Sequence, residues 1–168
     1  MMKEYFLVII AGLFFSQGIY SQSLYRPAES ATQQPFVQMG AIDKVKEEIK
    51  NNIDSYQKKE KSKDTTGYRN AYFKGSELQL VSAYYKDTAT EKHVEWYFQN
   101  GQFIFSVQLW IDKKNNDTLD YQRYYLANER LIAWLKFDKP VDRNSVIFKK
   151  LNYRMRDYIG ELKDDNKK

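Results

Sequence analysis

Apolar and polar residues alternate most clearly on both sides of an Asn-Gly pair at positions 100–101. In the stretch WYFQNGQFIF, residues 96–105, aromatic and branched apolar residues flank this pair. Asn-Gly between two such runs is typical of the two-residue type I′ turn of a β-hairpin, because both residues tolerate positive φ angles. Pairing outward from this turn predicts one mixed face, which carries Tyr97 and Ile104. The other face is purely apolar. On it, Phe98 is predicted to pair with Phe103, and Trp96 with Phe105.

The same unit occurs three times along the chain. AYFKGSEL, WYFQNGQF and YYLANERL begin at residues 71, 96 and 124, and each contains a tyrosine, an apolar residue and a two-residue turn. Three hairpins in series predict a six-stranded antiparallel meander, with residues 86–92 and 112–118 as its longer connections. The third turn, Asn128-Glu129, lacks the glycine that a type I′ turn favours, so this hairpin is predicted to be looser or differently registered.

Two segments have the three- and four-residue spacing of apolar positions that is typical of amphipathic helices. The run at residues 57–67 that follows the first of them is mixed in charge and is predicted to be a solvated connector. The second helix follows Pro140 and candidate N-caps at Asp142, Asn144 and Ser145. The apolar face of the first helix comprises Ile42, Val45, Ile49, Ile53 and Tyr56. That of the second comprises Phe148, Leu151, Met155, Tyr158 or Ile159, and Leu162.

These elements predict an α+β fold. It consists of a six-stranded antiparallel meander, made of three hairpins, with two amphipathic helices covering one face. The purely apolar face of the sheet lies beneath both helices in this arrangement. The mixed face is then left open to solvent.

The first residues are typical of an export signal. The apolar run from Tyr5 to Phe15 is too short to cross a membrane, since a spanning helix needs about 20 residues. An uncleaved N-terminal anchor is the alternative. The predicted location is periplasmic or secreted, with no transmembrane segment after signal cleavage. We predict a signal peptide over residues 1–23 that ends at Gly18, Ser21 or Ser23, a flexible leader over 24–35, a single α+β domain over 36–163 and a polar tail over 164–168.

Composition narrows the function classes. The chain has no cysteine, so an exported form has no disulfide and depends on its buried core, for which an aromatic content of 16% suffices. The formal net charge of +5 favours weak attraction to anionic surfaces. It is not a signature of nucleic-acid binding, and no nucleic-acid partner is predicted.

Motifs for catalysis, metals and cofactors are absent from the sequence. There is no cysteine thiolate, no pair of histidines for zinc, no glycine-rich phosphate loop and no Gly-x-Ser-x-Gly nucleophile elbow. The single histidine, His93, is a candidate base beside Glu95, but a solvent-facing strand histidine is the favoured interpretation because a flat open sheet does not position groups for catalysis. No catalytic residue, metal site or cofactor is predicted, and a hydrolase is the less favoured function.

The mixed face is the candidate functional surface. It is rich in Tyr, Trp and Arg, which are the residue types that anchor partners. We expect a protein or peptide partner, or a second copy of the chain, to bind there. Aromatics that only raise strand propensity, or cover by the leader, are the alternatives. The candidate binding residues are Tyr72, Tyr97, Ile104, Trp110, Arg123, Tyr125, Ile132 and Trp134, and Tyr85, His93 and Glu95 lie among them.

The predicted function is therefore an exported, non-enzymatic binding module. The alternative is a basic envelope-associated structural protein that binds anionic polymer. Such binding is expected to weaken as salt rises, because exposed charges are screened. The residues that carry this alternative are Lys149, Lys150, Arg154 and Arg156 of the second helix.

Residues 66–163 resemble known proteins in the sequences of their hairpins and in the order of their elements. Repeated hairpins of the form YF-x-NG-x-L between two helices, in a cysteine-free chain with an export signal, resemble small uncharacterised secreted proteins of Bacteroidetes-type bacteria. The layout is also similar to the α+β domains of PepSY-like and β-lactamase-inhibitor-like periplasmic proteins. The resemblance implies a binding module that uses an open sheet face. It assigns no functional residue, because no site motif is shared.

Overall fold

The computed structural model describes residues 34–167, and within that range the side chains of all residues except 34, 156–158 and 161–167. The predicted signal peptide, its cleavage sites and the leader as far as residue 33 lie outside the described residues. The elements occur in the order α1 (Gln34–Asn51), η1 (Ile53–Ser55), β1 (Gln57–Asp64), β2 (Gly67–Lys74), β3 (Glu77–Lys86), β4 (Thr90–Gln99), β5 (Gln102–Asp112), β6 (Thr118–Ala127), β7 (Arg130–Lys136), β8 (Lys139–Pro140) and α2 (Val146–Lys167).

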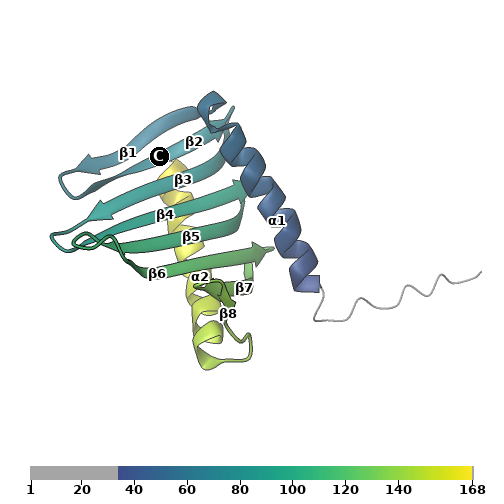
Figure 1. The fold of residues 1–168 in the computed structure, drawn as a ribbon. Helices are drawn as coiled ribbons and strands as arrows, with labels where there is room; N and C mark the ends of the chain where they lie inside the picture. The colour runs from purple at the N-terminus through teal and green to yellow at the C-terminus, as the bar shows by residue number, and fades with distance from the viewer. Residues whose placement is uncertain (1–33, 168) are drawn as a thin grey trace, which may run out of the picture.

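All eight strands form one antiparallel sheet in sequence order (Figure 1). The α+β class and the antiparallel meander are confirmed, and β2 to β7 are the strands of the three predicted hairpins. The predicted number of six strands is wrong, because β1 and β8 extend the sheet at its two edges. β8 is short and pairs only with Leu135 and Lys136 of β7.

β1 forms within the run that was predicted to be a solvated connector, and that prediction is wrong. Every residue of β1 except Lys61 is exposed. An edge strand needs hydrogen bonds on one side only and no buried side chain, so a polar sequence is sufficient once β2 offers its edge. The lysines of β1 also discourage pairing of its free edge with another chain.

Each of the three hairpins contains a β-bulge at the third residue of its second strand. The bulged residues are Gln79, Ile104 and Ile132, and the pairing shifts by one residue at each of them. These positions are 25 and 28 residues apart, which are the offsets of the sequence repeat. A bulge places two residues opposite one, so every later residue of that strand changes its partner and its face relative to a regular hairpin.

The bulge corrects the predicted pairing of the central hairpin. Phe98 pairs with Phe103 as predicted, but the partner of Tyr97 is Phe105 and the partner of Trp96 is Ser106. The predicted pairing of Trp96 with Phe105 is therefore wrong. Phe105 lies on the face of Tyr97, so both faces of the hairpin carry large apolar side chains.

The turns show how the repeat is closed. Asn100 and Gly101 have φ angles of 50° and 70°, as the predicted type I′ turn requires. Asn128 and Glu129 have φ angles of 50° and 59°, so the third hairpin has the same kind of turn without a glycine. The prediction of a different register is wrong there, because the flanking pair Ala127 and Arg130 closes the hairpin in the same way.

The two helices lie on opposite faces of the sheet (Figure 1), so the prediction that both cover one face is wrong. α1 buries Ile42 and Ile49 against one face, and α2 buries Phe148, Met155 and Ile159 against the other. Since the bulges supply apolar residues to both faces, each face needs its own cover. α2 continues to Lys167, through most of the predicted polar tail.

Candidate functional site

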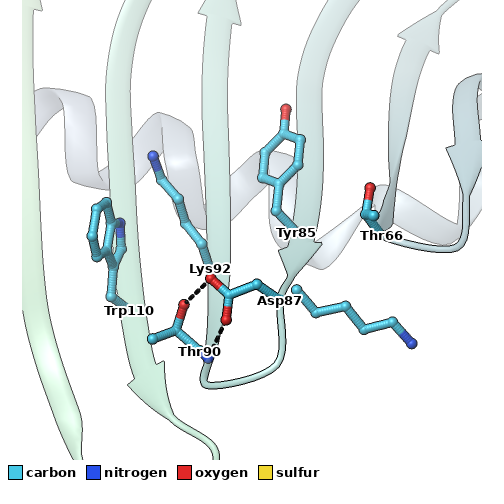
Figure 2. Close-up of a pocket in the computed structure, with 7 residues that line it drawn as sticks. Thr66, Tyr85, Asp87, Thr90, Lys92 and Trp110 are labelled. Carbon is cyan, nitrogen blue, oxygen red and sulfur yellow. Dashed lines mark hydrogen bonds between the residues drawn. The ribbon is translucent and has the colours of Figure 1, made fainter.

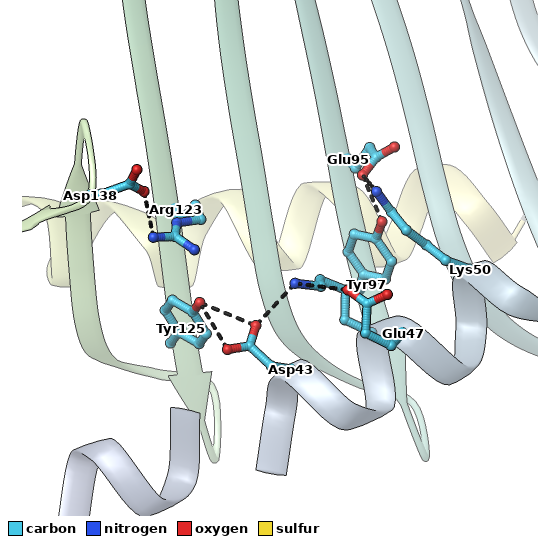
Figure 3. Close-up of polar contacts among 9 residues, drawn as sticks. Asp43, Glu47, Lys50, Glu95, Tyr97, Arg123, Tyr125 and Asp138 are labelled. Atoms are coloured by element: carbon cyan, nitrogen blue, oxygen red, sulfur yellow. Dashed lines mark hydrogen bonds and ion pairs between the residues drawn. The ribbon is translucent and has the colours of Figure 1, made fainter. Parts of the chain in front are cut away.

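α1 closes the face that was predicted to be open. Tyr97 is 0% exposed, and its hydroxyl donates a hydrogen bond of 2.6 Å to Glu95 (Figure 3). The Nζ atom of Lys50 in α1 lies 3.3 Å from the same Glu95 carboxylate. Burial, followed by the nearby Glu95, raises the pKa of Tyr97 above its ordinary value. Tyr97 is therefore a neutral structural anchor rather than an exposed binding residue.

Tyr125 anchors α1 in the same way. Its hydroxyl lies 3.2 and 3.3 Å from the two carboxylate oxygens of Asp43, which also accepts from Lys46 (Figure 3). Burial raises the pKa of Tyr125 to about 12, and the Asp43 carboxylate acts in the same direction. The side chain is buried beside Phe105, with ring centroids 4.9 Å apart.

The eight candidate binding residues are not brought together on one surface. Ile104 is buried with Tyr97 and Tyr125, and Tyr72 and Ile132 pack against the same α1-side core. Arg123 forms an ion pair of 2.5 Å with Asp138. The last two, Trp110 and Trp134, lie on the α2 face, where Trp134 is buried and Trp110 is 41% exposed.

His93 and Glu95, the candidate base and its neighbour, lie on the α1 side of the sheet. The His93 ring lies 4.9 Å from that of Tyr84, and its Nε2 atom lies 3.8 Å from Glu91. Glu95 is engaged by Tyr97 and Lys50. His93 is exposed on the protein surface, and its contacts among the described residues are with Tyr84 and Glu91.

α2 covers only part of its face of the sheet, and three hollows lie on this face, two of them lined in part by α2. The first, of about 360 Å³, is flanked by Tyr85 and Trp110. The second, of about 280 Å³, shares Lys92 with the first. The third, of about 420 Å³, lies between Trp134 and the start of α2 and shares Arg154 with the second. We call the three together the α2-side groove. It is lined by Thr66, Tyr85, Lys86, Asp87, Thr90, Lys92, Trp96, Ser106, Gln108, Trp110, Tyr124, Trp134, Val146, Ile147, Lys150, Leu151, Arg154 and Met155.

A row of three side chains forms the open end of the groove. Tyr85, Lys92 and Trp110 are cross-strand partners on β3, β4 and β5, and they stand side by side on the sheet (Figure 2). Tyr85 is 44% exposed and Trp110 is 41% exposed. Two strand spacings separate the aromatic residues, which is about 10 Å. The Lys92 Nζ atom lies 5.0 Å from the centre of the Trp110 ring.

The ionisable groups of this row differ in how they are engaged. Burial lowers the pKa of Lys92, and Asp120 opposes that shift. The Asp87 carboxylate accepts from the Thr90 backbone N–H at 2.6 Å and the Thr90 hydroxyl at 3.0 Å (Figure 2). It also accepts from the Ala89 N–H at 2.8 Å. These hydrogen bonds, that of the Thr90 N–H first, lower the pKa of Asp87. Asp87 therefore serves its own turn, whereas the neighbours of the Lys92 ammonium group are the Trp110 ring and the Asp120 charge.

The middle of the groove has a polar floor beneath α2. The Ser106 side chain is buried, and its hydroxyl has no hydrogen-bond partner among the described residues. Gln122 organises the neighbouring strand, because its Oε1 atom accepts from the Tyr124 hydroxyl and from Trp134 Nε1 at 3.0 Å. A buried hydroxyl without a partner is costly, so a ligand or water that reaches Ser106 gains a hydrogen bond there.

The charged side chains that line the groove are mostly cationic. The described residues that line it include four cationic side chains and one carboxylate. The carboxylate belongs to Asp87, whose oxygens are engaged in its own turn. The cationic side chains are Lys86, Lys92, Lys150 and Arg154. Asp120, the cross-strand partner of Trp110, lies beside the groove and forms an ion pair with Lys136.

Sequence reasoning found Trp110 and Tyr85 but missed Lys92 and Ser106. It placed the two aromatics with Tyr97 because it assumed regular hairpins. The bulge at Gln79 puts Tyr85 on the face opposite to Tyr72, and the bulge at Ile104 puts Trp110 on the face opposite to Tyr97. The signal that was available is that Tyr85 and Lys92 lie two residues before and two residues after the Asp87–Thr90 turn, which makes them cross-strand partners. Arg154 and Lys150 were identified as cationic residues of the second helix, and they line the groove.

Within residues 34–167, no group of three or more His, Asp or Glu side chains is placed to hold a metal ion. No helix in this part of the chain is long and apolar enough to cross a membrane. Comparisons with protein-family models, with curated proteins and with solved structures find no match to the chain. They do not bear on the resemblance to secreted Bacteroidetes-type proteins, which stays a prediction.

Proposed function

We propose that this protein is an exported, non-enzymatic binding module that holds an extended anionic ligand in the α2-side groove. The observation that carries the proposal is the balance of charge along the groove. Lys86, Lys92, Lys150 and Arg154 line it, and the carboxylate of Asp87 is turned to its own backbone. Cationic clefts concentrate and steer anionic ligands.

The shape of the groove supports a ligand that is long rather than compact. Its hollows follow one another from Val146 at the start of α2 to Tyr85 beyond the other end of the covered region, and neighbouring hollows share Arg154 or Lys92. Aromatic side chains occur in each hollow and provide contact area at small entropic cost. A polymer or an extended chain fits this geometry better than a small molecule does.

Binding is favoured over catalysis by how the reactive groups are distributed. Ser106 lies on the α2 side of the sheet, and His93 lies on the α1 side, so the sheet separates a hydroxyl nucleophile from the single histidine. Nucleophilic catalysis needs a base within hydrogen-bonding reach of the nucleophile. Recognition through an open aromatic face that contains Tyr97 and Tyr125 is not supported, because α1 covers that face.

Export remains part of the proposal and rests on the apolar run from Tyr5 to Phe15. The intact mass of the protein recovered outside the cytoplasm tests it. A mass that lacks the first 18 to 23 residues is expected, with the end at Gly18, Ser21 or Ser23. A mass that still includes Met1 contradicts cleavage.

The binding function can be tested through the three tryptophans. Trp96 and Trp134 are 3% and 7% exposed, whereas Trp110 is 41% exposed. In protein labelled with 5-fluorotryptophan, each gives one ¹⁹F signal that single Trp→Phe variants assign. On titration with polyanions of different chemistry (polymannuronate, poly-L-glutamate and oligo-dT), we expect at least one to move the Trp110 signal in a saturable manner.

A matched pair of variants locates the site. Lys92→Gln/Arg154→Gln removes two cations from the groove, and Lys44→Gln/Lys58→Gln removes two exposed cations from α1 and β1. The first variant is expected to weaken binding at least tenfold, and the second to leave it within about twofold, since distant exposed charges are screened. Equal losses in both variants, or no movement of Trp110 with any polyanion, contradict the proposed function.

A further inference from the structure

We infer that the extended anionic ligand of the α2-side groove is an acidic polysaccharide, a chain of sugar rings that carry carboxylates. This inference rests on the proposed function and specifies its ligand class. It follows from three features of the groove: what its floor offers for hydrogen bonding, how its aromatic residues are spaced and where its cations lie.

The floor of the groove offers side chains and no free backbone. Tyr85, Lys92 and Trp110 belong to β3, β4 and β5, and each of these strands pairs with a neighbour on both sides. Their N–H and C=O groups are therefore used within the sheet. A peptide that binds by adding a strand needs an unpaired edge, which this part of the sheet does not have. A ligand here must be recognised through hydroxyls, amides, rings and charges.

The polar side chains in the groove suit a ligand rich in hydroxyl groups. Thr66 and Thr90 line the open end, where their hydroxyls donate to Asp64 and Asp87 and can still accept a hydrogen bond. Gln108 lies beside Ser106 on the floor of the middle hollow. Hydroxyl and amide groups both donate and accept, as sugar hydroxyls do. The Ser106 hydroxyl, which has no partner among the described residues, is matched by any group of either kind.

The spacing of the aromatic residues suits a chain of rings. Tyr85 and Trp110 are two strands apart, or about 10 Å, on one face of the sheet. This separation is close to the length of a disaccharide unit in an extended polysaccharide, in which alternate rings present the same apolar face. Each aromatic side chain then supports one sugar ring, and the intervening Lys92 lies where the sugar between them carries its carboxylate.

The row from Tyr85 to Trp110 runs across the strands and meets Asp120 on β6. The cations of α2 lie to one side of this row, in the two hollows beside the helix, so a chain that reaches them must turn there. Arg154 lies between the middle and third hollows, and Lys150 follows it toward the start of α2. Arginine binds a carboxylate through two parallel hydrogen bonds, and lysine binds it as a point charge. A neutral polysaccharide would leave these cations unpaired, so the groove favours a polymer with repeated carboxylates.

The experiment compares three probes on the full-length mature protein by the Trp110 ¹⁹F signal and by calorimetry. They are polymannuronate, the same polymer after reduction of its carboxylates to alcohols, and poly-L-glutamate of similar charge. Polymannuronate is expected to bind at least tenfold more tightly than either of the others. Trp110→Ala is expected to weaken its binding at least tenfold, whereas Tyr153→Ala, which removes an aromatic residue exposed elsewhere on α2, leaves it unchanged.

The outcomes separate this inference from the proposed function. If the reduced polymer binds as tightly as polymannuronate, the groove does not recognise the carboxylates. If poly-L-glutamate binds as tightly, the groove does not recognise the sugar rings. Either result overturns the polysaccharide inference. In the second case, the proposed function stands if Lys92→Gln/Arg154→Gln still weakens binding at least tenfold. Tighter binding of oligo-dT than of polymannuronate overturns the inference in favour of a single-stranded nucleic acid. Absence of binding by all polyanions overturns both proposals.

Discussion

The effect of replacing a glycine with alanine depends on the surroundings of that glycine, as Gly67 and Gly40 show. A Cβ atom added at Gly67 would lie 2.0 Å from the backbone oxygen of Tyr84, whereas one added at Gly40 in α1 meets nothing within 4 Å. Gly67→Ala must push β2 and β3 apart and is expected to destabilise the protein by about 2–3 kcal/mol. Gly40→Ala is expected to stabilise it by about 1 kcal/mol through helix propensity. Urea unfolding measures the free energy of unfolding of both variants. If Gly67→Ala lost no more stability than an alanine substitution at an exposed position, the packing described for the β2–β3 pair would be contradicted.

The buried tyrosines predict how stability changes at high pH. Burial raises the pKa values of Tyr97, Tyr124 and Tyr125, with Glu95, Asp120 and Asp43 adding to the respective shifts and Arg123 opposing that of Tyr125. Above about pH 10, the unfolded chain loses phenol protons that the folded protein still holds. The unfolded state then binds fewer protons, so the free energy of unfolding falls as pH rises from about 10 toward 12.

Tyr125→Phe tests this directly. The variant loses the hydrogen bond to Asp43, which is expected to cost about 1 kcal/mol at neutral pH. Between pH 10 and 12 its free energy of unfolding should then fall less steeply than that of the wild type, because one raised phenol pKa is gone. Urea unfolding at pH 8 to 11.5 gives both slopes, and identical slopes would show that Tyr125 titrates alike in the folded and unfolded chain.

At the scale of elements, the bulges decide which side chains are buried. The Asn-Gly turn and the alternation around it predicted the central hairpin and its innermost pair, Phe98 with Phe103. They did not predict the extra residue at Ile104, because alternation of apolar and polar residues is the only register signal and this stretch is apolar at every position from 103 to 105. The repeat did contain a hint, since all three hairpins bulge at the equivalent position.

Core substitutions test whether α1 covers the face of Tyr97. If both helices covered the opposite face, as the sequence predicted, Tyr97 would be exposed and Tyr97→Ala would cost little. In the structure, Tyr97 and Phe105 are both buried beneath α1. Tyr97→Ala and Phe105→Ala are therefore each expected to cost about 3–5 kcal/mol by urea unfolding. Tyr153→Ala, at an exposed helix position, serves as the control, and a loss at Tyr97 no larger than at Tyr153 would contradict the position of α1.

The helices and the edge strand also show which features a local sequence pattern cannot predict. The apolar stripe of the second helix predicted its buried residues Phe148, Met155 and Ile159, because helix periodicity is a local property. Which face each helix covers depends on where the bulges send the strand residues, and no local pattern contains that information. β1 was missed because an exposed edge strand has no apolar alternation to recognise.

At the scale of the whole molecule, the candidate site is what two helices leave uncovered on a two-faced sheet. α1 takes the face that sequence reasoning reserved for a partner, and α2 covers its own face only in part (Figure 1). Sequence alone supplied several of the groove residues, such as Trp110, Lys150 and Arg154, but it assigned them to two separate surfaces. They meet in one groove because α2 lies on the face of Trp110.

Lys92 offers the most direct measurement of the central claim that the groove binds an anionic chain. Its pKa is lowered by burial, against the opposing effect of Asp120. A ligand carboxylate beside the ammonium group favours the charged form and raises this pKa. The ¹³Cε shift of Lys92, assigned with Lys92→Gln and followed against pH, is measured with and without saturating polymannuronate. We expect a value below that of an ordinary lysine in the free protein and a clear rise in the complex; a pKa that does not change while the polymer is bound would contradict binding in the α2-side groove.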